Sequence, residues 1–131
     1  MTLLLDSQAL VWWREGSRKL GARARTAIER DAFGVLVSAA SAWEIAIKSA
    51  SGKLRLREPA ERWLPAALDD SGFDALAVTI PHTLRAAALP AHHADPFDRL
   101  LIAQAQLETL TIVTADTAFD DYDVRILDAR L

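Results

Sequence analysis

Four acidic residues are candidates for chemistry because each lies at the end of a segment that predicts regular structure. They are spread over the whole chain: Asp6, Glu44, Asp98 and Asp116. Carboxylate oxygens are the ligands that Mg²⁺ and Mn²⁺ prefer, and these ions promote phosphoryl displacement. Two carboxylates 4–5 Å apart repel by about 3–4 kcal/mol, so a fold that gathers all four would favour a bound cation. The residue types therefore indicate a divalent metal centre.

Each acid also has a purely structural explanation. Asp6 suits a helix cap, Asp116 suits a turn, and Asp98 lies in a first helical turn, where the helix dipole favours negative charge. Glu44 stands three residues after Ser41, which is the S-x-x-E pattern of a capping box at a helix start. Taken singly, each acid is better explained as a cap. The metal hypothesis depends on all four meeting at one place.

The elements expected around these acids alternate between strands and helices. Short apolar runs predict strands, and apolar residues that recur every three to four positions predict helices. The expected strands are 3–5, 34–37, 76–78, 111–114 and 124–127, and the expected helices are 7–14, 20–30, 41–51, 59–69, 82–88 and 96–107. This alternation indicates one α/β domain over residues 1–131 with a mostly parallel sheet.

In such a sheet the four acids fall at one edge. Asp6 follows the first strand and Asp116 follows the fourth, while Glu44 and Asp98 are expected in the first turns of helices. Strand carboxyl ends and the N-termini of the following helices share one edge, which is where ligands of α/β proteins bind. The predicted topology therefore allows the four carboxylates to converge.

Other residues are candidates for supporting roles in the same pocket. Ser7 and Thr114 would add hydroxyl groups near the acids. Lys48 and Arg99, each close in sequence to one of the acids, would contact a phosphate or form ordinary ion pairs. Surface pairing explains both basic residues as well as substrate binding does.

We do not assign Asp95 or the adjacent histidines His92 and His93 to the metal. Asp95 directly precedes Pro96, which is typical of a helix cap. Side chains of adjacent loop residues generally point apart, so the two histidines are not expected to share an ion. The four tryptophans lie on amphipathic helices and are expected in the core or at a subunit interface: Trp12, Trp13, Trp43 and Trp63.

Composition limits the class of protein. The 131 residues include no cysteine, which excludes disulfides and thiolate metal sites and fits a cytoplasmic protein. No apolar run approaches the roughly 20 residues needed to span a membrane, and the first residues do not resemble a signal peptide. Net charge is −3, yet residues 14–62 hold eleven Lys and Arg against six Asp and Glu. That basic region is compatible with a phosphate-backbone ligand and equally with a mixed solvated surface.

Four segments together resemble PIN-domain ribonucleases, in particular the VapC-type toxins of type II toxin–antitoxin systems. They are LLLDSQALVWW at 3–13, VSAASAWEIAIKSASGKL at 37–54, HHADPFDRLLIAQAQ at 92–106 and TIVTADTAFDDYDV at 111–124. The resemblance covers nearly the whole chain. It implies a PIN-like three-layer α/β/α sandwich of about five strands and endonucleolytic cleavage of RNA with Mg²⁺ or Mn²⁺. It also implies inhibition by a cognate antitoxin, homodimers and hetero-oligomers with that antitoxin.

The resemblance can be carried over residue by residue. The family's acids fall on Asp6, Glu44, Asp98 and Asp116. The first, third and fourth would bind the metal, and Thr114 matches the hydroxyl residue that precedes the last acid. The first motif departs from the D-T-H that is usual in this group, because the chain reads Asp6-Ser7-Gln8 and Gln8 lacks an imidazole.

Other functions stay open. A non-catalytic protein could dock a partner while its acids merely cap helices, and a structure-specific DNA nuclease could use the same fold. An aspartyl phosphatase usually needs a second acid two residues after the first, where Gln8 stands. A nucleotide-binding module is disfavoured because no glycine-rich phosphate loop is present. Metal-dependent cleavage, measured in parallel on RNA and on DNA, separates these functions.

Overall fold

Five strands form one sheet in the order β3-β2-β1-β4-β5, and all neighbouring pairs are parallel. The computed structural model describes the backbone of residues 1–131 and the side chains of all of them except Asp31. The strands are β1 (Thr2–Leu5), β2 (Gly34–Ser38), β3 (Asp74–Leu76), β4 (Thr111–Thr114) and β5 (Arg125–Asp128). The predicted parallel sheet of five strands is confirmed.

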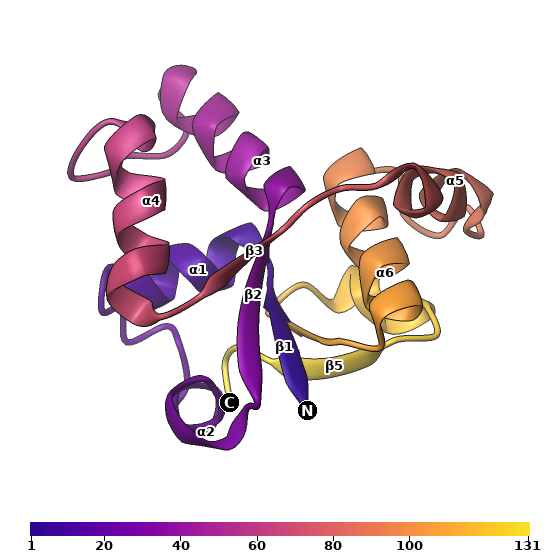
Figure 1. Ribbon diagram of the computed structural model, residues 1–131, viewed down its shortest axis with the longest axis horizontal. Helices are drawn as coiled ribbons and strands as arrows, with labels where there is room; N and C mark the ends of the chain where they lie inside the picture. The colour runs from indigo at the N-terminus through magenta and orange to yellow at the C-terminus, as the bar shows by residue number, and fades with distance from the viewer.

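Helices cover both faces of this sheet (Figure 1). One face carries α1 (Ser7–Arg14), α2 (Ala22–Thr26), α3 (Ala39–Ala50) and α4 (Ala60–Ser71), and the other carries α5 (Ile80–Ala88) and α6 (Pro96–Glu108). A π-helical turn, Ala27–Asp31, continues α2, and a 3₁₀ turn, Thr117–Asp121, follows β4. The expected three-layer α/β/α sandwich is therefore confirmed.

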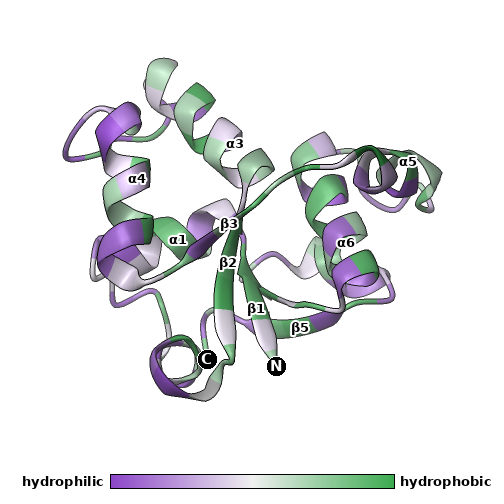
Figure 2. Cartoon of the chain, in the orientation of Figure 1, coloured by the Kyte–Doolittle hydropathy of each residue, from purple (hydrophilic) through white to green (hydrophobic). Residues whose placement is uncertain are grey.

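Alternating side chains of the central strands build two apolar cores. Leu3 and Leu5 of β1 pack on one face together with Val35 and Val37 of β2, while Leu4 packs on the other face. In Figure 2 the inner strands β1 and β2 are largely hydrophobic, whereas the helices carry both hydrophobic and hydrophilic residues. A strand that is apolar on both faces is typical of the middle of a parallel sheet. These residues therefore fix β1 at the centre.

Helix α3 begins earlier than the capping-box pattern predicts. Its N-cap is Ser38, whose hydroxyl accepts a hydrogen bond from the amide of Ala40 at 3.0 Å. Ser41 is buried inside the helix. The last residue of β2 caps the next helix without an intervening loop, so Glu44 lies in the second helical turn. Both its predicted place in the first turn and its capping-box explanation are wrong.

The remaining boundaries follow the sequence closely. Helix α1 and strand β4 span the predicted residues. Strand β3 lies two residues earlier than expected, at the sheet edge, where it pairs only with β2. Helix α6 has five consecutive buried residues, 101–105, as its apolar composition predicts. Among the residues described, no helix combines the length and the apolar character needed to cross a membrane.

Candidate metal centre

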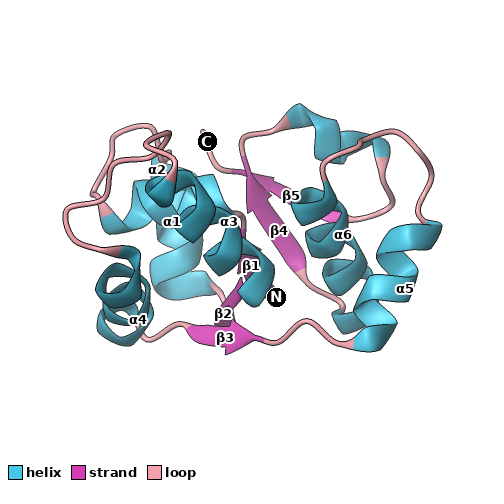
Figure 3. Ribbon diagram, turned by 90° about the horizontal axis from the view of Figure 1, so that it is seen from above, coloured by secondary structure: helices cyan, strands magenta, loops and turns pink.

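The predicted acids meet at the carboxyl edge of the sheet, where the strand order reverses between β1 and β4. Asp6 directly follows β1, and Asp116 lies two residues after β4. Figure 3 views the molecule from this end, with α1 and α3 on one side and α6 on the other. A cavity of about 360 Å³ is lined by Asp6, Glu44, Asp98 and Asp116, with Asp95, Ser7 and Lys48 beside them. The structure thus brings together the four carboxylates that the sequence placed at this edge.

Asp6 is buried and makes a helix cap as well as lining the cavity. Its Oδ1 accepts a hydrogen bond from the amide of Ala9 at 2.7 Å, which caps α1. Burial, reinforced by the charges of Glu44 and Asp116, raises the pKa of Asp6 to about 6, although hydrogen bonds from Thr114 and Ala9 act to lower it. Because Oδ1 alone makes the cap, the structural and the metal-binding explanations of Asp6 are compatible.

Glu44 has a partner on each carboxylate oxygen. The hydroxyl of Ser7 donates to Oε1 at 2.5 Å, and the ammonium of Lys48 lies 3.3 Å from Oε2. Of the two roles left open for Lys48, the structure shows the ion pair with Glu44. Since Glu44 itself is buried, it fixes both partners where they line the cavity.

Asp116 and Asp95 both cap local structure at the rim of the cavity. The carboxylate of Asp116 accepts from the amide of Ala118 at 2.9 Å, and its own amide donates to the Thr114 hydroxyl at 3.0 Å. Asp95 accepts from the amide of Phe97 at 2.8 Å, so its predicted role as the cap of α6 is confirmed. Asp95 nevertheless lines the cavity and adds a fifth carboxylate to it.

His93 joins the acids, although the sequence analysis did not assign it to the metal. Its Nε2 lies 2.7 Å from Oδ2 of Asp98, and both side chains are largely buried. Donor atoms of His93, Asp98 and Asp116 all lie within 4.8 Å of one another. Burial raises the pKa of Asp98 to about 6; Asp95 and Glu44 raise it as well, while the contact with His93 lowers it.

The two histidines diverge, as adjacent side chains generally do. The ring of His92 packs edge-on against Tyr122, with the ring centroids 5.2 Å apart, while His93 turns toward Asp98. The backbone amide of His93 donates to the Tyr122 hydroxyl at 2.8 Å. The direction of His93 thus depends on a residue far along the chain, which is why the HHADPFD run alone did not reveal it.

Arg99 is engaged away from the acids. Its guanidinium donates to four backbone carbonyls at 2.8–3.1 Å: Ala86, Leu89, Pro90 and His93. These hydrogen bonds fasten the segment between α5 and α6. The structure does not bring Arg99 into the lining of the cavity, so its contribution there is to hold the segment that carries His93.

The donor set fits a hard divalent cation. Five carboxylates line the cavity, and among the described lining residues Lys48 is the only basic one. The raised pKa values of Asp6 and Asp98 show that these acids resist ionisation without a compensating charge. Mg²⁺ and Mn²⁺ bind such oxygen donors. Asp98 and Asp116, with Asp6 beside them, could hold an ion of this kind.

Known proteins share this architecture. Structures similar to the chain include VapBC2 from Rickettsia felis bound to a promoter DNA fragment, with a TM-score of 0.72, 15% identity and coverage of 97% of this chain and 98% of that one. A toxin–antitoxin complex from Klebsiella pneumoniae gives a TM-score of 0.69, 19% identity and 97% coverage of each chain. FitAcB from Neisseria gonorrhoeae gives a TM-score of 0.67, 20% identity and 97% coverage of each chain.

At these sequence identities the structural similarity establishes the fold but not the function. No curated protein matches the sequence. The family model for the PIN domain matches residues 3–125, which is nearly the whole chain. On this match, with the parallel sheet and the acids at its carboxyl edge, the chain belongs to the PIN-domain family.

Proposed function

We propose that the protein is the toxin of a type II toxin–antitoxin pair and acts as a divalent-metal-dependent endoribonuclease. The observation that carries the proposal is the cavity at the carboxyl edge of a PIN-domain sheet, in which the four acids meet. One of the similar solved structures is a toxin–antitoxin complex, which supports the toxin role. Clustered carboxylates around a divalent ion suit hydrolysis of a phosphodiester bond.

In this proposal Asp6, Asp98 and Asp116 hold Mg²⁺ or Mn²⁺. A bound ion of this type supplies positive charge that stabilises the charge developing on the phosphate during hydrolysis. The Thr114 hydroxyl supports Asp6 by a hydrogen bond that favours the ionised carboxylate. The protein's part is to keep these carboxylates fixed at one place before the substrate arrives.

Glu44 contributes by positioning two groups at the cavity. It holds the Ser7 hydroxyl and the Lys48 ammonium, each through a different carboxylate oxygen. The side chain of Lys48 is half-exposed, and its ammonium can also contact a phosphate oxygen of RNA. Removal of Glu44 should therefore weaken substrate positioning even if the metal still binds.

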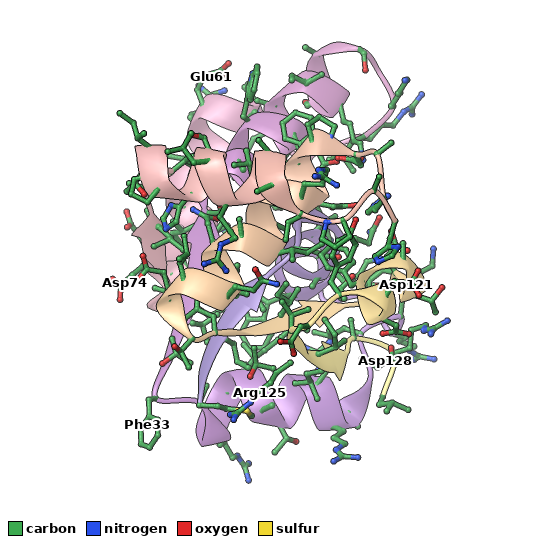
Figure 4. All side chains as sticks on the ribbon, turned by 90° about the vertical axis from the view of Figure 1, so that its right-hand side faces the viewer. Phe33, Glu61, Asp74, Asp121, Arg125 and Asp128 are labelled. Carbon is green, nitrogen blue, oxygen red and sulfur yellow. The ribbon has the colours of Figure 1, made fainter. Side chains whose placement is uncertain are left out.

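Cleavage assays on RNA and DNA of the same sequence test the proposal. The wild-type protein should cut RNA with Mg²⁺ or Mn²⁺ and lose activity when a chelator is added. Asp98→Ala should lower the rate by at least about 100-fold, because loss of a metal ligand should cost no less than loss of an outer-shell partner. Asp74→Ala is the matched control, since Asp74 is exposed at the outer edge of the sheet (Figure 4).

Three results would count against this function. One is the absence of RNA cleavage with either ion, which would favour a protein that only docks a partner. Another is full activity of Asp6→Asn, which would show that the cleavage reaction does not need the carboxylate of Asp6. Cleavage of DNA in preference to RNA would instead favour the DNA nuclease.

We also propose that a cognate antitoxin inserts an Arg or Lys side chain into the acidic cavity. Five carboxylates face Lys48 there, so an added cation would relieve their repulsion much as a metal does. A small reading frame overlapping this gene upstream would identify the antitoxin to test. Asp98→Asn combined with Asp116→Asn should weaken that complex by about tenfold or more. An unchanged affinity would contradict the proposed contact.

The proposal further includes homodimers and a cytoplasmic location. Large apolar side chains are exposed in pairs on two helices, at Trp43 and Ile47 of α3 and at Ile80 and Leu84 of α5. Burial of such side chains against a second copy would remove apolar surface from water. The absence of cysteine fits the reducing compartment in which an RNA substrate is found.

A further inference from the structure

We propose that His93 is a nitrogen ligand of the metal and that the site therefore favours first-row transition ions such as Mn²⁺ over Mg²⁺. The inference rests on the proposed metal-dependent function of the acidic cavity, which His93 adjoins through its contact with Asp98. It adds a ligand of a different chemical type to the acids predicted from the sequence. It also predicts that the site prefers Mn²⁺ to Mg²⁺, a preference that the acids alone do not predict.

The donor atoms already lie close to the spacing that shared ligation requires. Two ligands at right angles on one ion, each about 2.1 Å from it, lie about 3 Å apart, and opposite ligands lie about 4.2 Å apart. Nε2 of His93 is 2.7 Å from Oδ2 of Asp98, and the donors of His93, Asp98 and Asp116 are all within 4.8 Å of one another. Small side-chain movements would let one ion join all three.

The position of His93 is built by the surrounding structure. Its amide donates to the Tyr122 hydroxyl at 2.8 Å, and its carbonyl accepts from Arg99 at 3.1 Å. The Tyr122 hydroxyl in turn donates to the carbonyl of Pro90 at 2.9 Å. The imidazole lies edge-on to Phe119, with the ring centroids 6.4 Å apart, and is 20% exposed. A side chain held in this way is preorganised, as a metal ligand should be.

His93 could instead orient Asp98 by a hydrogen bond without touching the ion. Outer partners of this kind commonly fix ligating carboxylates. A ring nitrogen of His93 also lies within 4.8 Å of a carboxylate oxygen of Asp116, which a hydrogen bond to Asp98 alone does not require. The proximity to Asp116 therefore favours direct ligation over positioning.

Direct ligation by an imidazole affects which ion binds. Neutral imidazole nitrogen binds first-row transition ions, whereas Mg²⁺ takes oxygen ligands and retains several waters. His93 should therefore strengthen binding of Mn²⁺ much more than binding of Mg²⁺. Replacement by glutamine, which keeps a polar side chain but removes the imidazole, should abolish most of this difference.

Pulsed electron paramagnetic resonance of bound Mn²⁺ tests the inference, because the signal reports nitrogen atoms bound directly to the ion. The full-length wild-type protein is loaded with Mn²⁺ alone, once unlabelled and once with histidine carrying the heavy nitrogen isotope. We expect a nitrogen coupling that changes with the isotope. The coupling should disappear in His93→Gln and persist in His92→Gln, the matched control at the neighbouring position.

Metal titrations supply the second readout. His93→Gln should bind Mn²⁺ about tenfold or more weakly, with a much smaller change for Mg²⁺. Mn²⁺ that binds to the wild type without a histidine coupling would overturn the inference and leave the acidic metal site intact. A protein that binds no Mn²⁺ would overturn both. If His93→Gln fails to fold, a histidine coupling that persists in both His92→Gln and His82→Gln still assigns the ligand to His93, the remaining histidine of the chain.

Discussion

Asp6 shows how one side chain can serve the fold and the site at some cost to stability. It caps α1 through the amide of Ala9, yet it is buried near Glu44 and Asp116. Burial above all raises its pKa to about 6. At neutral pH the folded protein therefore holds a charge that it would hold more easily when unfolded. A bound cation would remove this unfavourable term.

The ion-free protein should therefore lose stability as pH rises from about 4 to about 6. In that window the folded state binds a proton at Asp6 that the unfolded state releases, because the pKa is about 6 when folded and 3.8 as the reference. Protonation of Asp6 therefore stabilises the folded state by about 2–3 kcal/mol below pH 4. This stabilisation is lost above pH 6. Asp98, with a pKa also raised to about 6 by burial, acts in the same direction.

Thermal denaturation with a chelator, at pH values from 4 to 8, measures this effect. Because other groups also titrate, the informative quantity is the difference in Tm between wild type and Asp6→Asn. The Tm of the wild type should fall relative to the Tm of this variant as pH rises toward 6. Mn²⁺ at pH 7 should raise the Tm of the wild type more than that of Asp6→Asn. A difference in Tm that does not vary with pH would contradict the proposed role of burial at Asp6.

For single residues, the sequence predicted where the acids lie at the sheet edge but not which side chains lie beside them. Asp6 and Asp116 follow strands that the apolar runs mark plainly, so their place at the sheet edge follows from local pattern. His93 is different, because Tyr122 and Arg99 fix its direction through hydrogen bonds across the fold. No local pattern contains those contacts, and a loop residue has no periodicity to reveal its orientation.

Among the elements, the junction of β2 and α3 explains why Glu44 was misplaced. Ser38 ends the strand, pairs in register with Leu76 and also caps the helix. The S-x-x-E pattern at Ser41 is a local preference worth about 1 kcal/mol, which sheet pairing and core packing readily override. The element was therefore predicted correctly and its first residue was not.

If the protein binds RNA as proposed, a second cavity next to the acids offers a path for the strand. It measures about 250 Å³, shares Ser7, Gln8 and Lys48 with the acidic cavity, and is also lined by Lys53. Lys53→Glu should weaken RNA binding by about tenfold and reduce the salt dependence by about one phosphate contact. Fluorescence anisotropy in an Asp98→Ala background, which prevents cleavage, measures both quantities.

Lys19→Glu makes the same charge change in the turn before α2 and is the matched control. It should leave the affinity for RNA nearly unchanged if the strand runs past Lys53. Equal losses in the two variants would indicate a general effect of net charge and would contradict a defined path.

The contact between α2 and the last residues of the chain depends on Gly21. Its amide donates to the carbonyl of Ala129 at 2.8 Å, and a Cβ at this position would lie 2.1 Å from the carbonyl carbon of Leu131. Figure 1 shows the C-terminus beside α2. Gly21→Ala should displace this backbone and destabilise the protein by about 1–3 kcal/mol.

Urea denaturation measures that loss of stability. Gly34→Ala is the control, because a Cβ there would meet only one side-chain atom, at 3.8 Å. Since Gly34 lies in β2, the control should be neutral or slightly stabilising. Equal effects of the two substitutions would show that the crowding at Gly21 is relieved without cost.

For the molecule as a whole, the sequence predicted the layers but could not supply the order of the strands. Alternating strands and helices imply a parallel sheet with helices on its faces. The order β3-β2-β1-β4-β5 depends on which strands pair at long range, and apolar runs of similar composition carry no such information. The same limit applies to the outer surfaces, because exposure is decided only once the layers are assembled.

Several large apolar side chains remain exposed after this assembly. Trp63 is in the core, as expected, but Trp43 is 63% exposed on α3 and packs only edge-on against Phe97. Leu84, on α5, is 67% exposed. Phe33 is also exposed, but it projects alone from the turn before β2 (Figure 4). The pairs on α3 and α5 are therefore the better candidates for a subunit interface.

If these two helices form the dimer interface, Ile47→Glu and Leu84→Glu should each dissociate the dimer. Each substitution would bury an unpaired carboxylate against apolar side chains, so the dissociation constant should rise by about 100-fold. Light scattering coupled to size exclusion, over a range of concentrations, measures the mass. Phe33→Glu adds the same charge at an exposed aromatic residue and should leave the mass unchanged. A dimer disrupted by Phe33→Glu alone would place the interface at the turn before β2. A monomeric wild type would contradict self-association, because no second copy would then cover α3 and α5.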